Sequence, residues 1–207
     1  MPETGSLKQV VSTKEQILAA AMELFSEFGY KGASVRKIAG KVGIRESALY
    51  NHFANKEDIF QSVASSIFST PFSGDEKSSV SERAKGGKKF LSNFIVQYKL
   101  VTFDKNKERL FRIMMIELLQ NAQLRKNFME EYHNKNVKML SEAFFVMMQE
   151  GLVRSSDPML MANEFLAPLF YLRLQVTLLR IDGQSTTALS TQFEKHVEFF
   201  WESVAAG

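Results

Sequence analysis

The 207-residue sequence contains no cysteine. This absence excludes a disulfide framework, a zinc site built on thiolates and a redox sensor based on thiols. The sequence also lacks internal repeats and low-complexity blocks. A chain of this length is long enough for a small domain and a larger second domain with a hydrophobic core of its own.

Residues that form catalytic or metal sites are scarce as well. The three histidines lie far apart and have no partners at the spacing of metal ligands: His52, His133 and His196. His133 stands beside Glu130 and Glu131, a pattern more typical of a solvated helix face than of a metal site. The glycine-lysine run at residues 86–89 lacks the preceding strand and the spacing of a phosphate-binding loop. We therefore predict that the protein is not an enzyme and has no catalytic residue, no metal site and no cofactor.

Signals for export or membrane insertion are also missing. Residues 1–12 lack the apolar run of a signal peptide, and we expect them to form a flexible arm. A long apolar segment covers residues 158–181. Glu164, Arg173 and Arg180 inside it argue against a membrane span. The expected location is the cytoplasm, with no membrane partner.

The N-terminal part of the chain has the pattern of three short helices. Thr13 and Gln16 stand in the relation of a capping box, and apolar residues then recur at helical spacing. Gly29 is expected to end this first helix. Ser34 is expected to cap a second helix, and Gly43 permits a sharp turn into a third. Two helical patterns broken once by a glycine are the sequence shape of a helix-turn-helix.

The third helix is expected to bury Ala48, Leu49 and Phe53 and to turn its polar residues outward. Those polar types suit nucleic acid, because arginine pairs with guanine edges, asparagine pairs with adenine, and tyrosine and histidine donate to phosphates. Between Lys31 and Lys56 the sequence has six basic residues and one acidic residue, whereas the rest of the chain is close to neutral. The positive charge is therefore concentrated on this segment.

Four short motifs in this region resemble the DNA-binding head of TetR-family repressors. They are Ser34-Val-Arg-x-Ile-Ala, Val42-Gly-Ile, Ala48-Leu-Tyr-x-His-Phe53 and Asn55-Lys-Glu-Asp-Ile59. Two positions depart from the family pattern, because Arg45 stands where serine or threonine is common and Ser47 stands where glycine is common. Arg45 cannot cap a helix as serine does, so we expect a loosely held start of the third helix until DNA orders it.

The exposed positions and the resemblance together predict the DNA contacts. Lys56 opens the next helix, where free N–H groups and a cation attract a phosphate. Glu46 has two interpretations: it accepts from a cytosine amine, or it pairs with Arg45 or Lys41 on the surface. The predicted DNA-binding residues are Ser34, Arg36, Arg45, Glu46, Ser47, Tyr50, Asn51, His52 and Lys56.

Residues 13–60 thus form the predicted DNA-binding domain, and residues 61–207 form the second domain. Pro71 and Gly74 break the helical pattern, and residues 73–81 are expected to form a loop. Only long helices follow, with Gly151 as a stop signal and Asp157-Pro158 as a start signal. Two helices are expected near residues 90–101 and 106–120, and a third is expected to end at Gln149. The last two are expected at residues 158–181 and 189–204.

The second domain is rich in phenylalanine and methionine. Such residues either fill the core, which is the simpler reading for any single one of them, or line a cavity that adapts to apolar molecules. The resemblance implies a binding site for a small, largely hydrophobic effector. The candidate ligand-binding residues are Phe111, Met114, Met115, Glu117, Phe170, Tyr171 and Leu174.

The last two helical segments carry more apolar surface than one bundle core needs, which indicates a dimer interface. In TetR-like proteins the final two helices pair into a four-helix bundle. Two heads related by a two-fold axis read a palindrome in successive major grooves, roughly 34 Å apart. The expected function is a ligand-responsive, homodimeric transcriptional repressor that an effector releases from double-stranded DNA. The alternative is a helical protein-interaction adaptor that retains the head as a scaffold.

Overall fold

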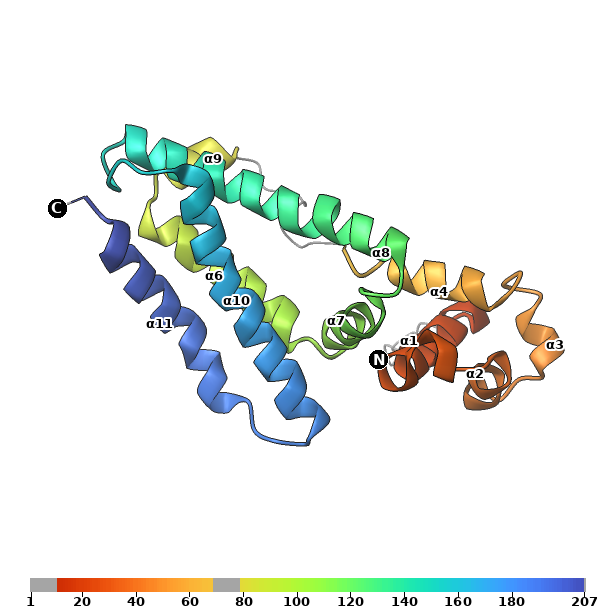
Figure 1. The fold of residues 1–207 in the computed structure, drawn as a ribbon. Helices are drawn as coiled ribbons and strands as arrows, with labels where there is room; N and C mark the ends of the chain where they lie inside the picture. Colours follow the sequence, from red (N-terminus) through yellow and green to blue (C-terminus); the bar gives the residue numbers. More distant parts are fainter. Residues whose placement is uncertain (1–10, 69–78, 207) are drawn as a thin grey trace, which may run out of the picture. The chain divides into compact units, whose positions relative to one another are not determined.

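The computed structural model describes residues 11–68 and 79–206 and builds them from helices, apart from an isolated bridge between Val153 and Ala205 (Figure 1). This confirms the predicted all-α fold. Residues 1–10 of the predicted arm and residues 73–78 of the predicted loop lie outside the described residues. Within the described part of the chain, no helix combines the length and the apolarity that crossing a bilayer requires.

The chain forms two compact units. The first contains the residues up to Ile67 together with Arg109–Gln120, and the second contains Phe68–Glu108 and Asn121–Gly207. The helices of the first unit are α1 (Thr13–Gly32), α2 (Val35–Val42), α3 (Glu46–Leu49), α4 (Lys56–Ala64) and most of α7 (Lys105–Glu117). The helices of the second unit are α5 (Val80–Ala84), α6 (Lys88–Phe103), α8 (Ala122–Asn127), the π-helix η2 (Phe128–Asn134), α9 (Lys135–Gln149), α10 (Pro158–Ile181) and α11 (Thr187–Val204).

The capping box at the start of α1 lies one residue earlier than the sequence pattern suggested. The Ser12 N–H donates to Glu15 Oε2 at 2.8 Å, and the Glu15 N–H donates to Ser12 Oγ at 3.3 Å. The predicted pair of Thr13 and Gln16 is therefore wrong. The Glu15 carboxylate accepts more strongly than a glutamine amide does. Gln16 instead donates from Nε2 to the carbonyl of Val11 at 3.0 Å.

Gly29 interrupts α1 as predicted, although the chain adds a further turn up to Gly32. Its backbone has φ 68° and ψ 176°, a conformation that glycine adopts without strain. Because of this interruption, the N–H of Tyr30 does not bond within the helix. It donates to Glu117 Oε1 at 2.7 Å. A Cβ placed on Gly29 would lie 3.0 Å from the same oxygen, so the approach of α7 also requires glycine here.

The turn between α2 and α3 also follows the sequence signals. Ser34 caps α2 with its Oγ, which accepts from the Lys37 N–H at 3.2 Å. Gly43 has φ 80° and ψ 24°, and the Ile44 N–H donates to the carbonyl of Ala39 at 3.0 Å. This is the Schellman arrangement, which ends α2 and fixes the direction in which the chain enters α3.

The core of the first unit contains a segment that the sequence had placed in the second domain. Leu110 and Ile113 of α7 are buried in one cluster with residues of α1 to α4. At the rim of this cluster, Arg109 pairs with Glu23 at 3.5 Å. The C-terminal part of α7 is therefore a structural element of the head, a long-range relation that local periodicity cannot reveal.

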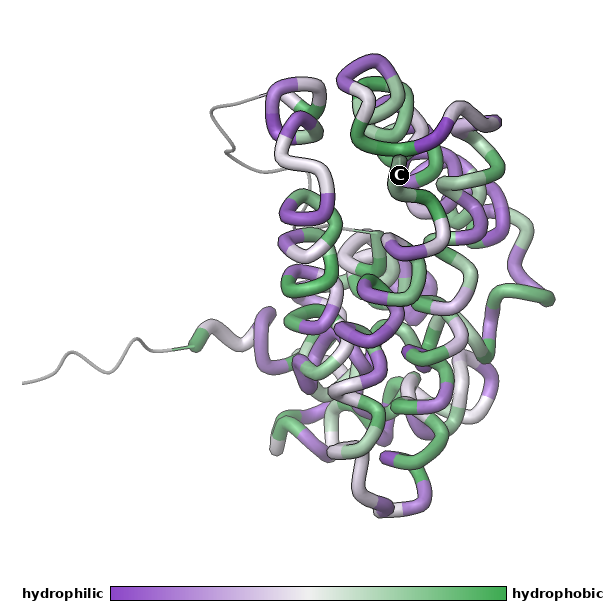
Figure 2. The backbone as a smooth tube through the Cα atoms, turned by 90° about the vertical axis from the view of Figure 1, so that its left-hand side faces the viewer, coloured by the Kyte–Doolittle hydropathy of each residue, from purple (hydrophilic) through white to green (hydrophobic). Residues whose placement is uncertain are grey.

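The second unit surrounds a core rich in phenylalanine. α10 packs against both α9 and α11, and α11 also packs against α6. Figure 2 shows hydrophobic and hydrophilic residues alternating along the backbone. The buried residues of α9 and α11 recur at helical spacing, so each of these two helices buries one face. The fully buried aromatic side chains of this core are Phe144, Phe165 and Phe193.

Several helix boundaries of the second unit were predicted and others were not. Asp157 caps α10 by accepting from the Met159 N–H at 2.8 Å, and Gly151 follows α9 with φ 68°. Two features were missed. Ser79 caps the short helix α5 where the loop was expected to continue, and the single helix expected up to Gln149 contains the π-helix η2. Hydrophobic periodicity does not signal the wider turns of a π-helix, which are rare and frequently mark functional sites.

The hydrogen bond from Tyr30 to Glu117 can be tested with two substitutions. Glu117→Ala removes the acceptor, and we expect it to lower the free energy of unfolding by about 1–3 kcal/mol, since hydrogen bonds to charged groups contribute in that range. Glu117→Gln keeps an oxygen at the same place and should cost clearly less. Urea unfolding followed by circular dichroism measures both variants. Equal losses would show that the acceptor oxygen is not what stabilises the head.

Two glycines of the helix-turn-helix form a matched pair for a second test. Gly40 lies within α2 and has open space around it, so Gly40→Ala should stabilise the head by about 0.5–1 kcal/mol. Gly43 has the left-handed conformation, so Gly43→Ala should destabilise the head by about 1–2 kcal/mol, although open space surrounds it too. Thermal unfolding measures the stability of both variants. Changes in stability of the same sign would contradict the proposed role of the turn.

Candidate nucleic-acid interface

The helix that carries the predicted base contacts is shorter than expected. α3 contains only Glu46–Leu49, and the chain continues in tight turns in which the His52 N–H donates to the carbonyl of Leu49 at 3.0 Å. Arg45 occupies the N-cap position without a side-chain capping bond, as predicted from its departure from the family pattern. Leu49 and Phe53 are buried and anchor this segment to the core of the head.

Around these anchors the polar residues face outward. Tyr50 is 50% exposed although its neighbour Leu49 is fully buried, so the anchoring of one side chain presents the other to solvent. Of the predicted DNA-binding residues, those in the exposed class are Ser34, Arg36, Arg45, Glu46, Ser47, Tyr50, Asn51 and His52. The structure therefore brings a set of hydrogen-bonding side chains to the surface of α2, of α3 and of the turn that follows α3.

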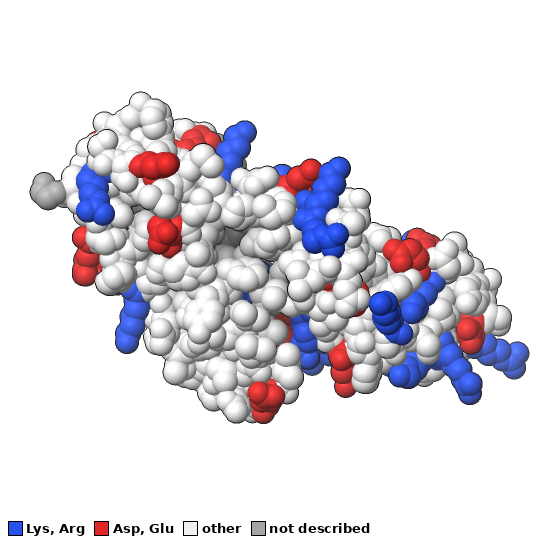
Figure 3. All heavy atoms as spheres, in the orientation of Figure 1, with Lys and Arg blue, Asp and Glu red and all other residues white. Residues whose placement is uncertain are grey.

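The cations of this surface differ in what already holds them. Lys37 lies over the ring of Phe28, with Nζ 4.9 Å from the ring centroid. Lys41 pairs with Glu23 at 2.8 Å. One interpretation of Glu46 was an ion pair with Lys41, and the described residues do not form that pair. Basic side chains project from this part of the head (Figure 3). Among the described residues, no hydrogen bond or ion pair involves the exposed guanidinium groups of Arg36 and Arg45, so these two are available to a ligand.

Lys56 has a structural role that sequence reasoning missed. Its Nζ donates to the carbonyl of Tyr30 at 2.9 Å and to that of Ala33 at 3.0 Å, and it lies 4.2 Å from the centroid of the Tyr30 ring. The last carbonyls of a helix lack intrahelical partners, which is the signal that could have indicated such a contact. A lysine has three donors, so one N–H remains for the phosphate contact that we predict.

The seven candidate ligand-binding residues divide between the two units. Those in the first unit are Phe111, Met114, Met115 and Glu117, and those in the second are Phe170, Tyr171 and Leu174. Glu117 is engaged by the N–H of Tyr30, whereas Tyr171 is exposed. Phe170 lines a cavity of about 330 Å³ in the second unit, together with Phe128 and Tyr132 of the π-helix. Their assignment to an effector stays a prediction.

Two family models match the chain. The model for bacterial regulatory proteins of the tetR family matches residues 17–63. The model for the C-terminal domain of AefR-like transcriptional repressors matches residues 89–200, which is more than half of the chain. The first match covers the helix-turn-helix and its anchoring helices, and the second covers most of α6 to α11.

Individual relatives agree with this assignment. The transcriptional repressor AcnR of Corynebacterium diphtheriae is 39% identical over 51 residues, which cover 25% of this chain and 27% of that protein. The fatty acid metabolism regulator protein of Bacillus subtilis is 30% identical over 125 residues, or 60% of this chain and 62% of that one. The aligned parts therefore cover less than two thirds of either relative.

A solved structure shows the same fold over nearly the whole chain. A TetR-family transcriptional regulator from Pseudomonas syringae superposes with a TM-score of 0.65 and covers 94% of this chain and 98% of that one, at 16% sequence identity. The fold, the helix-turn-helix and the match over most of the second unit lead to one conclusion. The chain belongs to the TetR family, whose members are DNA-binding transcriptional regulators and not enzymes.

Proposed function

We propose that the protein is a ligand-responsive transcriptional repressor that binds a palindromic operator as a homodimer. The observation that carries this proposal is the exposed surface of the helix-turn-helix, from α2 to the turn that follows α3. Arg36 of α2 and Arg45 before α3 are exposed and hold no partner among the described residues. Tyr50 and Asn51 lie exposed directly after α3. Exposed guanidinium and amide groups are the groups that read guanine and adenine in the major groove.

The contacts divide into two kinds. Arg36, Arg45 and Asn51 are proposed to read bases, with Ser47 and Tyr50 beside them, since base edges carry the sequence information. The proposed phosphate contacts come from residues at helix starts and at the edge of the head. They are Ser34, His52 and Lys56, and they position the head without selecting a sequence.

The dimer is proposed to form through the exposed faces of α10 and α11. Along α10, Leu160, Tyr171, Leu178 and Ile181 are each more than half exposed and recur at intervals that keep them on one face. Phe199 of α11 is 73% exposed. Exposed apolar side chains gathered on one helix face mark an interaction surface. Pairing it across a two-fold axis gives the two heads the symmetry of a palindrome.

The proposed response to an effector requires two states of the dimer that bind it differently. α7 begins in the second unit and ends in the first, where Glu117 accepts the N–H of Tyr30. An effector that binds better to the state in which the heads do not fit successive major grooves lowers the affinity for the operator.

Selection of binding sites from random duplexes, with the whole protein at near-physiological salt, tests the proposal. We expect a palindrome. Arg45→Ala should lower the affinity for that palindrome by about tenfold or more and relax the preference at one base pair of each half-site, because a bidentate contact to a base contributes about 1–3 kcal/mol.

Lys126→Ala, which removes an exposed cation of α8, is the matched control and should leave the affinity and the selected motif unchanged. A folded dimer that enriches no sequence would contradict DNA reading and favour a protein-interaction adaptor. An Arg45→Ala variant that recovers the same motif with the same affinity would remove the base contact assigned to Arg45.

A charge on the exposed face of α11 tests the dimer. Phe199→Glu should produce a monomer and abolish binding to the palindrome, since an unpaired carboxylate buried at an interface is strongly unfavourable. Phe145→Glu, on an exposed phenylalanine of α9, should leave the dimer intact. Light scattering after size-exclusion chromatography gives both masses. A Phe199→Glu variant that stays dimeric would place the interface elsewhere.

A further inference from the structure

The cavity that Phe170 lines lies between the π-helix η2 and α10, within the second unit. Its volume of about 330 Å³ is in the range of small-molecule binding sites. Phe170 is the one residue suggested by the sequence for effector binding that is among the described lining residues. The chemistry of the cavity therefore has to be derived from its other side chains.

The wider turns of η2 bring two consecutive residues to this cavity. Neighbouring side chains point about 100° apart in an α-helix. A π-helix has more residues in each turn, so the angle between neighbours is smaller. Tyr132 and His133 both line the cavity, together with Phe128, which stands four residues before Tyr132. The irregular helix therefore shapes the lining of this site.

Three aromatic rings form walls of the cavity. Phe128 and Tyr132 of η2 stack with 5.4 Å between their ring centroids. Phe170 of α10 meets both rings edge to face, at centroid distances of 6.2 and 6.3 Å. All three are only partly buried, whereas Phe144 and Phe165 of the core are fully buried. Part of each of the three rings is therefore open to a ligand.

The ring of Tyr132 is held in place by its hydroxyl. This hydroxyl lies 2.7 Å from that of Tyr98, a buried residue of α6, and the two share a hydrogen bond. The bond fixes the direction of the ring that lines the cavity. The face of an aromatic ring carries partial negative charge, and it attracts a cation that lies within about 6 Å of the ring centroid.

The carboxylate of Glu164 gives the cavity a full negative charge. Glu164 lies on α10, and the described lining residues include no lysine or arginine. Among the residues that the structure describes, no hydrogen bond or ion pair involves this carboxylate. The neighbouring Asn163 donates from Nδ2 to the carbonyl of Met159 at 2.9 Å, so the group that it offers to a ligand is its amide oxygen, an acceptor.

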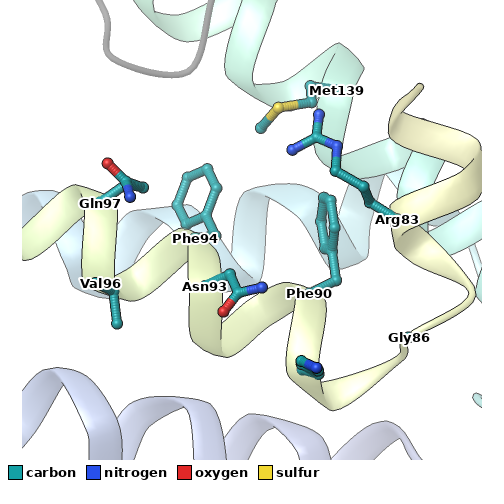
Figure 4. A pocket seen from close by; sticks show the side chains of 9 residues that line it. Arg83, Gly86, Phe90, Asn93, Phe94, Val96, Gln97 and Met139 are labelled. Carbon is teal, nitrogen blue, oxygen red and sulfur yellow. The ribbon is translucent and has the colours of Figure 1, made fainter. Parts of the chain in front are cut away.

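A larger cavity, of about 410 Å³, lies where α5, α6 and α9 meet (Figure 4). In the described part of the chain, the two cavities share no lining side chain. The described charged residues that line the larger one are Arg83 and Lys89, and Figure 4 shows the Arg83 guanidinium at one end of it. The two linings therefore differ in the sign of their charge, and a cationic ligand favours the smaller cavity.

We propose that the cavity between η2 and α10 binds an organic cation, such as a quaternary ammonium compound. Its charged group lies against the faces of the three rings with Glu164 beside it, and its apolar substituents lie along Leu166. A neutral molecule of the same shape lacks the attraction to the rings and to the carboxylate, and an anion is repelled by the carboxylate. This inference rests on the proposed function only in taking the bound molecule as the effector, and it names the chemical class of that effector.

Calorimetric titration of the whole protein tests the proposal. The probes are benzyltrimethylammonium and choline. Neohexyl alcohol, in which a carbon replaces the nitrogen of choline, is the neutral counterpart. We expect both cations to bind, and we expect neohexyl alcohol to bind at least about fivefold more weakly than choline. The reason is that a cation–π contact and an exposed ion pair each contribute a factor of about two to five.

Two substitutions separate the ring from the charge. Phe128→Leu keeps an apolar wall and should weaken choline binding by about threefold, with neohexyl alcohol unaffected. Its matched control is Phe145→Leu, at an exposed phenylalanine of α9 that does not line the cavity. Glu164→Gln keeps the size of the side chain and should also weaken choline binding by about threefold. Its matched control is Glu130→Gln, at an exposed carboxylate of η2 that does not line the cavity. Both controls should bind choline as the unmodified protein does.

Three outcomes would overturn the proposal: neither cation binds, neohexyl alcohol binds as tightly as choline, or either variant binds choline as its control does. Glu164 stands four residues after Leu160, on the face of α10 proposed for the dimer. Light scattering therefore checks that the Glu164→Gln variant is still a dimer. If it is not, the comparison of Phe128→Leu with Phe145→Leu decides alone.

These titrations contain no DNA, so they are independent of the operator. A protein that selects a palindrome without preferring cations remains a regulator and loses this site. One that prefers cations through Phe128 and Glu164 but selects no palindrome keeps the site and loses the proposed function.

Discussion

Tyr30 joins three helices of the head, α1, α4 and α7. Its N–H donates to Glu117 of α7 at 2.7 Å, and its carbonyl accepts from Lys56 of α4 at 2.9 Å. Its ring packs edge to face against Phe60 at 5.0 Å. Burial, followed by a hydrogen bond with Glu57, raises the pKa of the Tyr30 hydroxyl to about 12, so the ring stays neutral at any pH at which DNA is bound. The contact with Glu117 depends on the interruption at Gly29, which leaves the N–H of Tyr30 without a partner inside α1.

This arrangement explains why a recognition helix of one turn can hold a defined direction. α3 has too few residues to be stable alone, because a helix gains stability only after its first turn. Its direction comes instead from the Schellman turn at Gly43 on one side and from the buried Phe53 on the other. The next helix, α4, is fixed through Lys56 to the end of α1. The exposed groups of Arg45 and Tyr50 are therefore positioned by contacts that lie on the opposite side of the backbone.

The sequence contains the local part of this design and lacks the long-range part. The cap at Ser34, the turn at Gly43 and the start of α10 were predicted correctly because each depends on residues within one turn of the chain. The capping box at Ser12 was missed by one position, since two adjacent residue pairs fit the pattern and only the strength of the acceptor distinguishes them.

The features that were not predicted join residues far apart in the sequence. Glu117 was assigned to a ligand site, and it accepts from a backbone group that only the interruption at Gly29 makes available. The cavity lined by Arg83 and Lys89 combines a short helix that was expected to be a loop with the face of α6, so no periodic pattern could have assembled it. Local rules recognised the fold and the family, whereas the cavity and the place of α7 in the core of the first unit required the tertiary structure.

An effector must change the binding free energy for the operator by a definite amount. α6 ends at Phe103 and α7 begins at Lys105, with Asp104 alone between them. Asp104 caps α7 by accepting from the Lys107 N–H at 2.8 Å. Contiguity of this kind does not by itself produce coupling, because a ligand shifts an equilibrium only by its difference in affinity between two states. A tenfold loss of operator affinity requires about 1.4 kcal/mol of that difference, which is about the contribution of one charge-assisted hydrogen bond. A single charge-assisted contact that exists in one state and not in the other is therefore sufficient for the regulation proposed here.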